Sequence, residues 1–187
     1  MNNFILQIYF IVFSTMLWSS ESDQTVFLEQ QVKDNSLVQA YKNNNFKGMK
    51  KLLKEGANPN NALHNDWPLL LRAAHDENSA FVKLLIQHGA NVYTVERQEG
   101  YRIIHIAIDT ANLKLVRWLL NKYPDLKNQS TRAFGVNKRR YTPYQIVKQT
   151  LEDPSIKPKE RKRLKKIEKF FLLRRSPRIE NRNVFHP

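Results

Sequence analysis

The stretch RIIHIAIDTANLKLVRWLL, residues 102–120, contains two short apolar segments separated by a turn. Apolar residues fill most of the first segment, and Leu, Val and Trp recur at helical spacing in the second. Each segment is too short to form a stable helix in isolation, so the two must pack against each other and against neighbouring copies. The stretch therefore predicts one unit of a helical repeat.

Two related stretches precede it, LVQAYKNNNFKGMKKLLKEGANPN from Leu37 and PLLLRAAHDENSAFVKLLIQHGANV from Pro68. Their ends match as KKLLKEGAN and VKLLIQHGAN, and Gly56 and Gly89 lie 33 residues apart. Tyr123 stands 34 residues further on, where a third glycine would fall. A fixed period of this length is typical of repeat proteins. We expect both glycines to end helices in the left-handed conformation.

These features resemble the ankyrin repeat, with its TPLH opening, its paired Ala in the first helix and its LL-x-x-GA ending. The third copy keeps the His as His105, but Arg102 and Ile103 replace Thr and Pro, so the usual Thr to His hydrogen bond cannot form. A fourth copy opens with YTPYQIV, residues 141–147, and has Gln145 instead of His. The resemblance implies an all-α, ankyrin-type helical repeat solenoid of about four repeats with short hairpin fingers.

The resemblance also implies a division of the chain, in which the repeat domain covers residues 35–173. Its four repeats are expected at residues 35–61, 66–94, 100–126 and 141–173, after an N-terminal linker at 23–34 and before a basic, disordered tail at 174–187. The second repeat is expected to carry one extra residue around Asp76 to Ser79. An enlarged connection at residues 127–140 is a candidate contact element.

The N-terminus begins with an uncharged, mostly apolar run from Phe4 to Trp18. Fifteen residues span roughly 22 Å of helix, less than the roughly 30 Å hydrocarbon core of a bilayer. The pattern therefore favours a signal peptide at residues 1–22, with cleavage between Ser22 and Asp23, and an exported protein that is periplasmic or secreted. The alternatives are an uncleaved membrane anchor and a buried N-terminal helix.

The positive charge is concentrated near the C-terminus. The chain carries a net charge of +14, yet residues 1–126 hold 13 Lys and Arg against 12 Asp and Glu, whereas residues 127–187 hold 18 against 5. Within KPKERKRLKKIEKFFLLRR, residues 157–175, Leu164, Ile167 and Phe171 recur at helical spacing. We interpret this stretch as a charged helix that caps the repeats. Anionic lipid or an acidic protein are its alternative ligands, and nucleic acid is disfavoured.

The sequence favours a non-enzymatic protein with no cofactor and no metal. It has no Cys, its five His residues show no metal-binding spacing, and neither a glycine-rich phosphate loop nor a GxSxG motif occurs. His105 falls at the structural His of the family, and we expect it in the core or in a turn. Trp118 is also expected in the core.

Aromatic residues mark one equivalent position in three repeats, just before each TPLH-like opening. Large aromatics and Arg are the side chains that most often anchor interfaces. The candidate partner-binding residues are therefore Trp67, Arg97, Tyr101, Arg102, Arg139, Arg140 and Tyr141. The alternative is that the aromatic rings only shield the turns.

The predicted function is that of a monomer that binds another protein, one with acidic groups, through the concave surface of its fingers and inner helices. An inhibitor, immunity factor or accessory factor would fit this description. An effector-like ankyrin protein directed into a host is the alternative.

Overall fold

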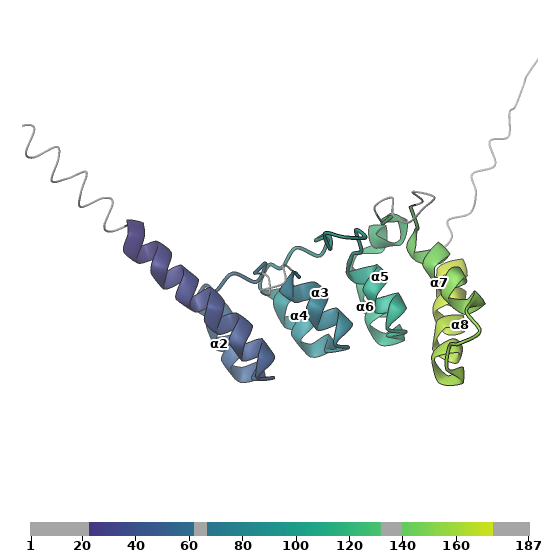
Figure 1. Cartoon of the computed structure of the whole chain (residues 1–187), viewed down its shortest axis with the longest axis horizontal. Coiled ribbons are helices and arrows are strands. Elements are labelled where there is room, and N and C mark those ends of the chain that lie inside the picture. Colours follow the sequence, from purple (N-terminus) through teal and green to yellow (C-terminus); the bar gives the residue numbers. More distant parts are fainter. Residues whose placement is uncertain (1–22, 62–66, 132–139, 174–187) are drawn as a thin grey trace, which may run out of the picture. The chain divides into compact units, whose positions relative to one another are not determined.

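The computed structural model describes residues 23–61, 67–131 and 140–173. Residues 23–42 are helical and are followed by α2 (Phe46–Lys54), α3 (Leu69–His75), α4 (Ser79–Gln87), α5 (Ile103–Asp109), α6 (Leu113–Lys122), the 3-10 helix η1 (Pro124–Asn128), α7 (Pro143–Glu152) and α8 (Pro158–Leu173) (Figure 1). No strand forms in the described residues, and the predicted all-α repeat fold is confirmed. The predicted signal peptide and basic tail lie outside these residues.

The described residues divide into two compact parts, one within residues 1–70 and 80–91 and the other within residues 71–79 and 92–187. Each repeat contributes a first helix and a second helix. The first helices are residues 23–42, α3, α5 and α7, and the second helices are α2, α4, α6 and α8. Among the described residues, no helix is both long enough and apolar enough to span a bilayer.

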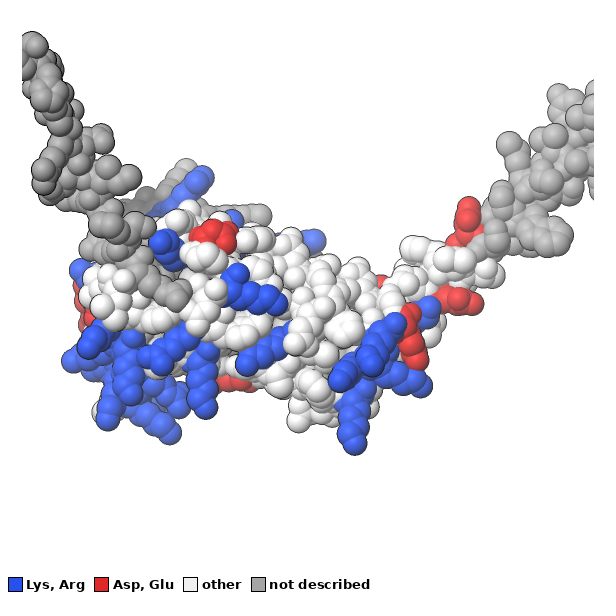
Figure 2. All heavy atoms as spheres, turned by 180° about the vertical axis from the view of Figure 1, so that it is seen from behind, with Lys and Arg blue, Asp and Glu red and all other residues white. Residues whose placement is uncertain are grey.

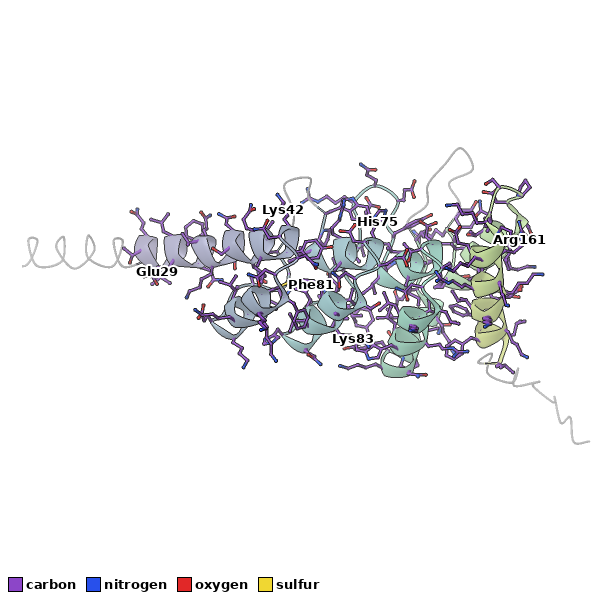
Figure 3. All side chains as sticks on the ribbon, turned by 90° about the horizontal axis from the view of Figure 1, so that it is seen from below. Glu29, Lys42, His75, Phe81, Lys83 and Arg161 are labelled. Carbon is purple, nitrogen blue, oxygen red and sulfur yellow. The ribbon has the colours of Figure 1, made fainter. Side chains whose placement is uncertain are left out.

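In the first part, aromatic rings hold the helices together. Phe81 lies on α4 (Figure 3). Its ring meets those of Tyr41 and Phe46 edge-on, with centroids 5.3 and 5.4 Å apart. In the same part of the chain, Leu37, Met49 and Leu85 are fully buried. Edge-to-face pairs of this kind stabilise a core beyond the area that they bury.

Residues 23–34 form a helix, where the sequence predicted a linker. The segment contains neither Gly nor Pro, so nothing in it interrupts the helix that continues to residue 42. Gln30 donates to the carbonyl of Gly56 at 3.1 Å, and Asp34 accepts from the N–H of Asn58 at 2.7 Å. These bonds connect the segment to the end of the first repeat, which explains the difference.

The turn between the first and second helices has the same backbone in three repeats. Asn44, Glu77 and Ala111 adopt φ values of 51°, 54° and 49°. In each case the N–H of the following residue bonds to the carbonyl five residues before it. The prediction of an extra residue at Asp76 to Ser79 is therefore wrong. The longer interval lies between Gly89 and Tyr101, where an exposed finger absorbs the added residue without disturbing the helices.

Helix ends follow the expected chemistry in two repeats and depart from it in the third. Gly56 and Gly89 have φ values of 91° and 92°, which confirms the predicted left-handed conformation. Tyr123 has φ −133° and ψ 74°, because the following Pro124 restricts it to extended conformations. The third repeat therefore continues into η1, where Leu126 is fully buried.

The core of the second part centres on α5, whose residues 103–108 are all buried. Helix α5 packs against α6 and α7, and α8 packs against α6 and α7 (Figure 1). Leu164, Ile167 and Phe171 are buried, as their spacing predicts. Trp118, which was expected in the core, is only half-buried and meets Tyr123 edge-on at 6.5 Å.

Candidate functional site

Each connection between repeats is closed at its base by a backbone hydrogen bond. The bonds run from Leu69 N–H to Asn61 O at 2.9 Å, from Glu96 N–H to Tyr101 O at 2.8 Å, and from Thr131 N–H to Tyr141 O at 3.0 Å. A connection closed in this way forms a finger whose base is fixed by the neighbouring helices. The tips of the first and third fingers, residues 62–66 and 132–139, lie outside the described residues.

The finger at residues 95–102 is stabilised from within by the buried side chain of Glu96. Its carboxylate accepts hydrogen bonds from the N–H of Gln98 and from the N–H of Glu99, the latter at 2.8 Å. Gly100 supplies the positive φ of 74° that the turn needs. As a result the tip is ordered, and the side chain of Arg97 is exposed on it.

Sequence reasoning did not identify Glu96 as a determinant of the finger. The available signal was a short acidic turn sequence, because a carboxylate can accept from the N–H groups two and three residues later. The same pattern occurs in many exposed loops where no such bond forms, so it did not distinguish this position.

His105 at the start of α5 joins this finger to the next connection. Its Nδ1 accepts from the N–H of Arg102 at 3.1 Å, and its Nε2 lies 3.0 Å from the carbonyl of Gln129. A backbone N–H can only donate and a carbonyl can only accept, so the proton is on Nε2. Burial lowers the pKa of His105 to about 4, an effect that the nearby Arg102 increases and the bond to Gln129 opposes. His105 is therefore neutral near pH 7, and the prediction of a core or turn histidine is confirmed.

Arg102 and Tyr101, both predicted to bind a partner, lie at the base of the finger. The Arg102 guanidinium donates to the carbonyl of Ser130 and is half-buried. The Tyr101 ring lies 5.8 Å from the His105 ring, and its pKa is raised to about 12, mainly by burial and then by the charge of Glu99. Both side chains therefore support the finger, which favours the shielding interpretation for the Tyr101 ring.

The remaining predicted residues divide between exposed and supporting positions. Arg140 is exposed, and Tyr141 beside it is half-buried, with its N–H donating to the Thr131 hydroxyl at 3.0 Å. Trp67 is half-buried in the first part of the chain. Arg139 lies outside the described residues. In the second part, the structure thus leaves Arg97 and Arg140 as the predicted residues that are exposed.

The fourth repeat opens with a different arrangement. The hydroxyl of Thr142 accepts from the N–H of Gln145 at 3.3 Å, and the Gln145 side-chain oxygen accepts from the N–H of Thr142 at 2.8 Å. This reciprocal pair is a capping box that begins α7. Gln145 therefore accepts a hydrogen bond from the backbone N–H three residues before it, as His105 does in the third repeat.

The arrangement is suited to contact and not to proton transfer. Both ring nitrogens of His105 are engaged with backbone groups, so it has no free lone pair with which to act as a base. Within the described ranges, no three His, Asp or Glu side chains are grouped as metal ligands would be. What the site offers is a braced finger with exposed Arg97 and Glu99 at its tip.

Comparison with known proteins supports the repeat interpretation. A family described as ankyrin repeats, in three copies, matches residues 37–130. The match covers the first three repeats, and α7 and α8 form a helix pair beyond it. No curated protein matches the chain.

Proposed function

The chain belongs to the ankyrin repeat family, and we propose that it binds one partner protein through its fingers and the exposed sides of its first helices. Ankyrin repeats generally mediate protein–protein interaction, and the family is typically non-enzymatic. The observation that carries the proposal is the finger at residues 95–102. Its internal bonds order the backbone before any partner arrives, which lowers the entropy cost of binding.

The exposed side chains indicate the chemistry of the partner. Arg97 and Arg140 are exposed cations at two successive fingers of the second part, and guanidinium groups pair well with carboxylates. Arg102 links the two fingers by donating to Ser130. We therefore expect a partner with acidic groups, bound by a single copy of this chain without the help of a cofactor.

The apolar run from Phe4 to Trp18 supports a location outside the cytoplasm. An exported binding module of this size would act as an inhibitor, an immunity factor or an accessory factor of another exported protein. Retention of residues 1–22 in the purified protein, measured by intact mass, would favour the anchored form over cleavage between Ser22 and Asp23.

Site-specific photocrosslinking tests the proposed surface. A photoreactive residue at Arg97 or Arg140 should capture one protein in the native source, while the same residue at Lys83 on α4, a second helix, should not. Mass spectrometry then identifies the captured protein. Capture from Lys83 alone would contradict the proposal, because it would place the contact on the second helices.

Binding measured with that purified protein provides the quantitative test. The double substitution Arg97→Ala and Arg140→Ala should weaken the affinity about 10-fold or more, since each lost charged contact at an interface contributes on the order of 1 kcal/mol. The matched control is Lys83→Ala with Lys114→Ala, two exposed lysines on the second helices α4 and α6, which removes the same charge outside the proposed surface. If both double variants weakened binding equally, the interaction would be a non-specific charge attraction and the proposed surface would be wrong.

A further inference from the structure

The charges of the chain segregate by helix type. The second helices carry 15 Lys and Arg against two Asp and Glu, whereas the first helices carry four against five. Helices α2, α4 and α6 contain no acidic residue. This pattern is invisible in the near-neutral total of residues 1–126, because the balancing carboxylates lie on the first helices and in the connections.

Helix α8 presents the densest part of this charge (Figure 2). One stripe of the helix, running from Pro158 to Lys169, is lined by Pro158, Arg161, Lys162, Lys165, Lys166 and Lys169. The twelve residues extend about 17 Å along the axis. The four lysines are exposed, and in the described part of the chain no carboxylate forms an ion pair with them. Their charges therefore repel one another, and the two carboxylates of α8, Glu160 and Glu168, form no ion pair with them.

Arg161 differs from the lysines because it is used inside the protein. Its guanidinium donates to the carbonyls of Leu151 and Asp153, both at 2.6 Å, and so holds the connection between α7 and α8 (Figure 3). On the neighbouring α6, Arg117 lies over the Phe170 ring at 5.8 Å. Arg161 thus joins α8 to the end of α7, and Arg117 joins α6 to α8, while the ammonium groups of the lysines remain available to an external ligand.

The end of α8 adds apolar side chains to the charged stripe. Leu172 and Leu173 are 44% and 74% exposed, within one turn of Lys169. The apolar residues in the middle of the helix, Leu164 and Ile167, are buried in the protein core. Helix α8 therefore cannot insert along its length, but it can rest its lysines on a charged surface with two leucines at one end.

This combination fits an anionic bilayer better than a nucleic acid. Sequence-tolerant binding of single strands uses aromatic rings on which bases stack, and the Phe170 ring is covered by Arg117. Lysine behaves as a point charge, attracted to any negative surface, whereas the bidentate recognition of phosphates and bases relies on Arg. Exposed leucines beside the stripe have no role on a polyanion in water, but they gain free energy at the boundary of headgroups and acyl chains.

We infer that the stripe Lys162, Lys165, Lys166 and Lys169, together with Leu172 and Leu173, is a docking surface for a membrane rich in anionic lipid. It lies on a second helix, whereas the proposed partner contacts lie on the fingers. The two surfaces therefore do not compete by using the same residues, and a membrane-docked chain retains its finger at residues 95–102.

Vesicle binding of the full chain tests this inference. Phosphatidylcholine vesicles are compared with vesicles of equal parts phosphatidylcholine and phosphatidylglycerol, and the double substitution Lys162→Glu with Lys166→Glu is compared with a matched control, Lys42→Glu with Lys148→Glu. All four lysines are exposed, and both variants change the net charge equally. Partitioning onto the anionic vesicles should fall about 30-fold or more for the α8 variant, because each lysine lost at the membrane surface removes about 1 kcal/mol of attraction. The control should fall several-fold less.

Because the apolar run at residues 4–18 can itself attach to vesicles, a second readout locates the contact. Amine-reactive labelling followed by mass spectrometry should show the α8 lysines protected on the anionic vesicles and accessible on the neutral ones. Lys42 and Lys148 should label equally on both. Equal losses for the two variants, or α8 lysines that label freely on anionic vesicles, would overturn the inference. So would binding to a DNA duplex that anionic vesicles cannot displace.

Discussion

The third and fourth repeats open at the same structural position with different chemistry. His105 is buried, and its two ring nitrogens join Arg102 to Gln129, 27 residues apart in the chain. Thr142 and Gln145 form a capping box at the surface, and its bonds stay within one turn of helix. The first arrangement couples neighbouring segments and depends on a neutral imidazole, while the second is local and carries no titrating group. The two openings should therefore respond differently to mutation and to pH.

The largest difference is expected from removing the side chains. His105→Ala should lower the free energy of unfolding by about 4 kcal/mol, because it leaves a cavity and removes the partners of two buried backbone groups. Gln145→Ala should cost only about 1 kcal/mol, because water can replace the exposed amide. Urea unfolding monitored by circular dichroism measures the loss in each variant. Equal losses would mean that His105 does not couple the two neighbouring segments.

Acidification should affect the third repeat specifically. The pKa of His105 is lowered to about 4 from an ordinary 6.5, so the unfolded chain takes up the proton first as pH falls. The contribution of the neutral, buried His105 to the free energy of unfolding is complete above about pH 6.5. It is lost as the pH falls towards 4, and the total loss is about 3 kcal/mol.

The control for this prediction is His105→Gln, which makes the third opening resemble the fourth. The carboxylates of the chain also take up protons as the pH falls. The quantity to measure is therefore the difference between the unfolding free energies of the wild type and the variant, from pH 7.5 to 4. A difference that stays constant across this range would show that His105 is not the titrating group.

A smaller effect is expected at the fourth opening. Thr142→Ala removes the hydroxyl that accepts from the N–H of Gln145 and should cost about 1 kcal/mol, with no dependence on pH between 5 and 8. Thr142→Ser keeps the acceptor and should cost less than half as much. The slope of stability against pH distinguishes this loss from that at His105.

The smallest expected effect concerns the turn that three repeats share. Glu77 is exposed and holds a φ of 54°, a conformation that strains a residue with a Cβ atom. Glu77→Gly relieves this strain but raises the entropy of the unfolded chain. The net effect should be a stabilisation of about 0.5 kcal/mol. The same substitution at Asn44 should gain less, because Asn tolerates this conformation. A clear destabilisation by Glu77→Gly would mean that its side chain forms a contact worth more than the strain.

The sequence predicted the repeats because their apolar spacing and their glycines follow directly from packing. The left-handed turn was not predicted, because Asn44, Glu77 and Ala111 have no side-chain property in common and the surrounding hydrogen bonds impose the conformation. The extra residue was misplaced for the same reason. A sequence comparison can align helix ends, but it does not show which connection can lengthen freely.

In the candidate site, the structure gives different positions to residues that the sequence grouped together. Aromatic and Arg residues do gather at the fingers, yet Arg102 and Tyr101 support the base while Arg97 and Arg140 are exposed. The sequence could not separate these roles, because they depend on which carbonyls and rings the folded chain brings nearby. The segregation of charge was missed because a total over residues 1–126 averages the two helix types.

The imidazole bond described above also makes one proton observable. The Nε2 proton of His105 is buried and held by the carbonyl of Gln129, so it exchanges with water only when this part of the chain opens. Such a proton should give a separate, slowly exchanging resonance at low field in a proton NMR spectrum, apart from the rapidly exchanging ring protons of exposed histidines. The rate at which this proton exchanges with water would report how often the base of the finger opens in solution.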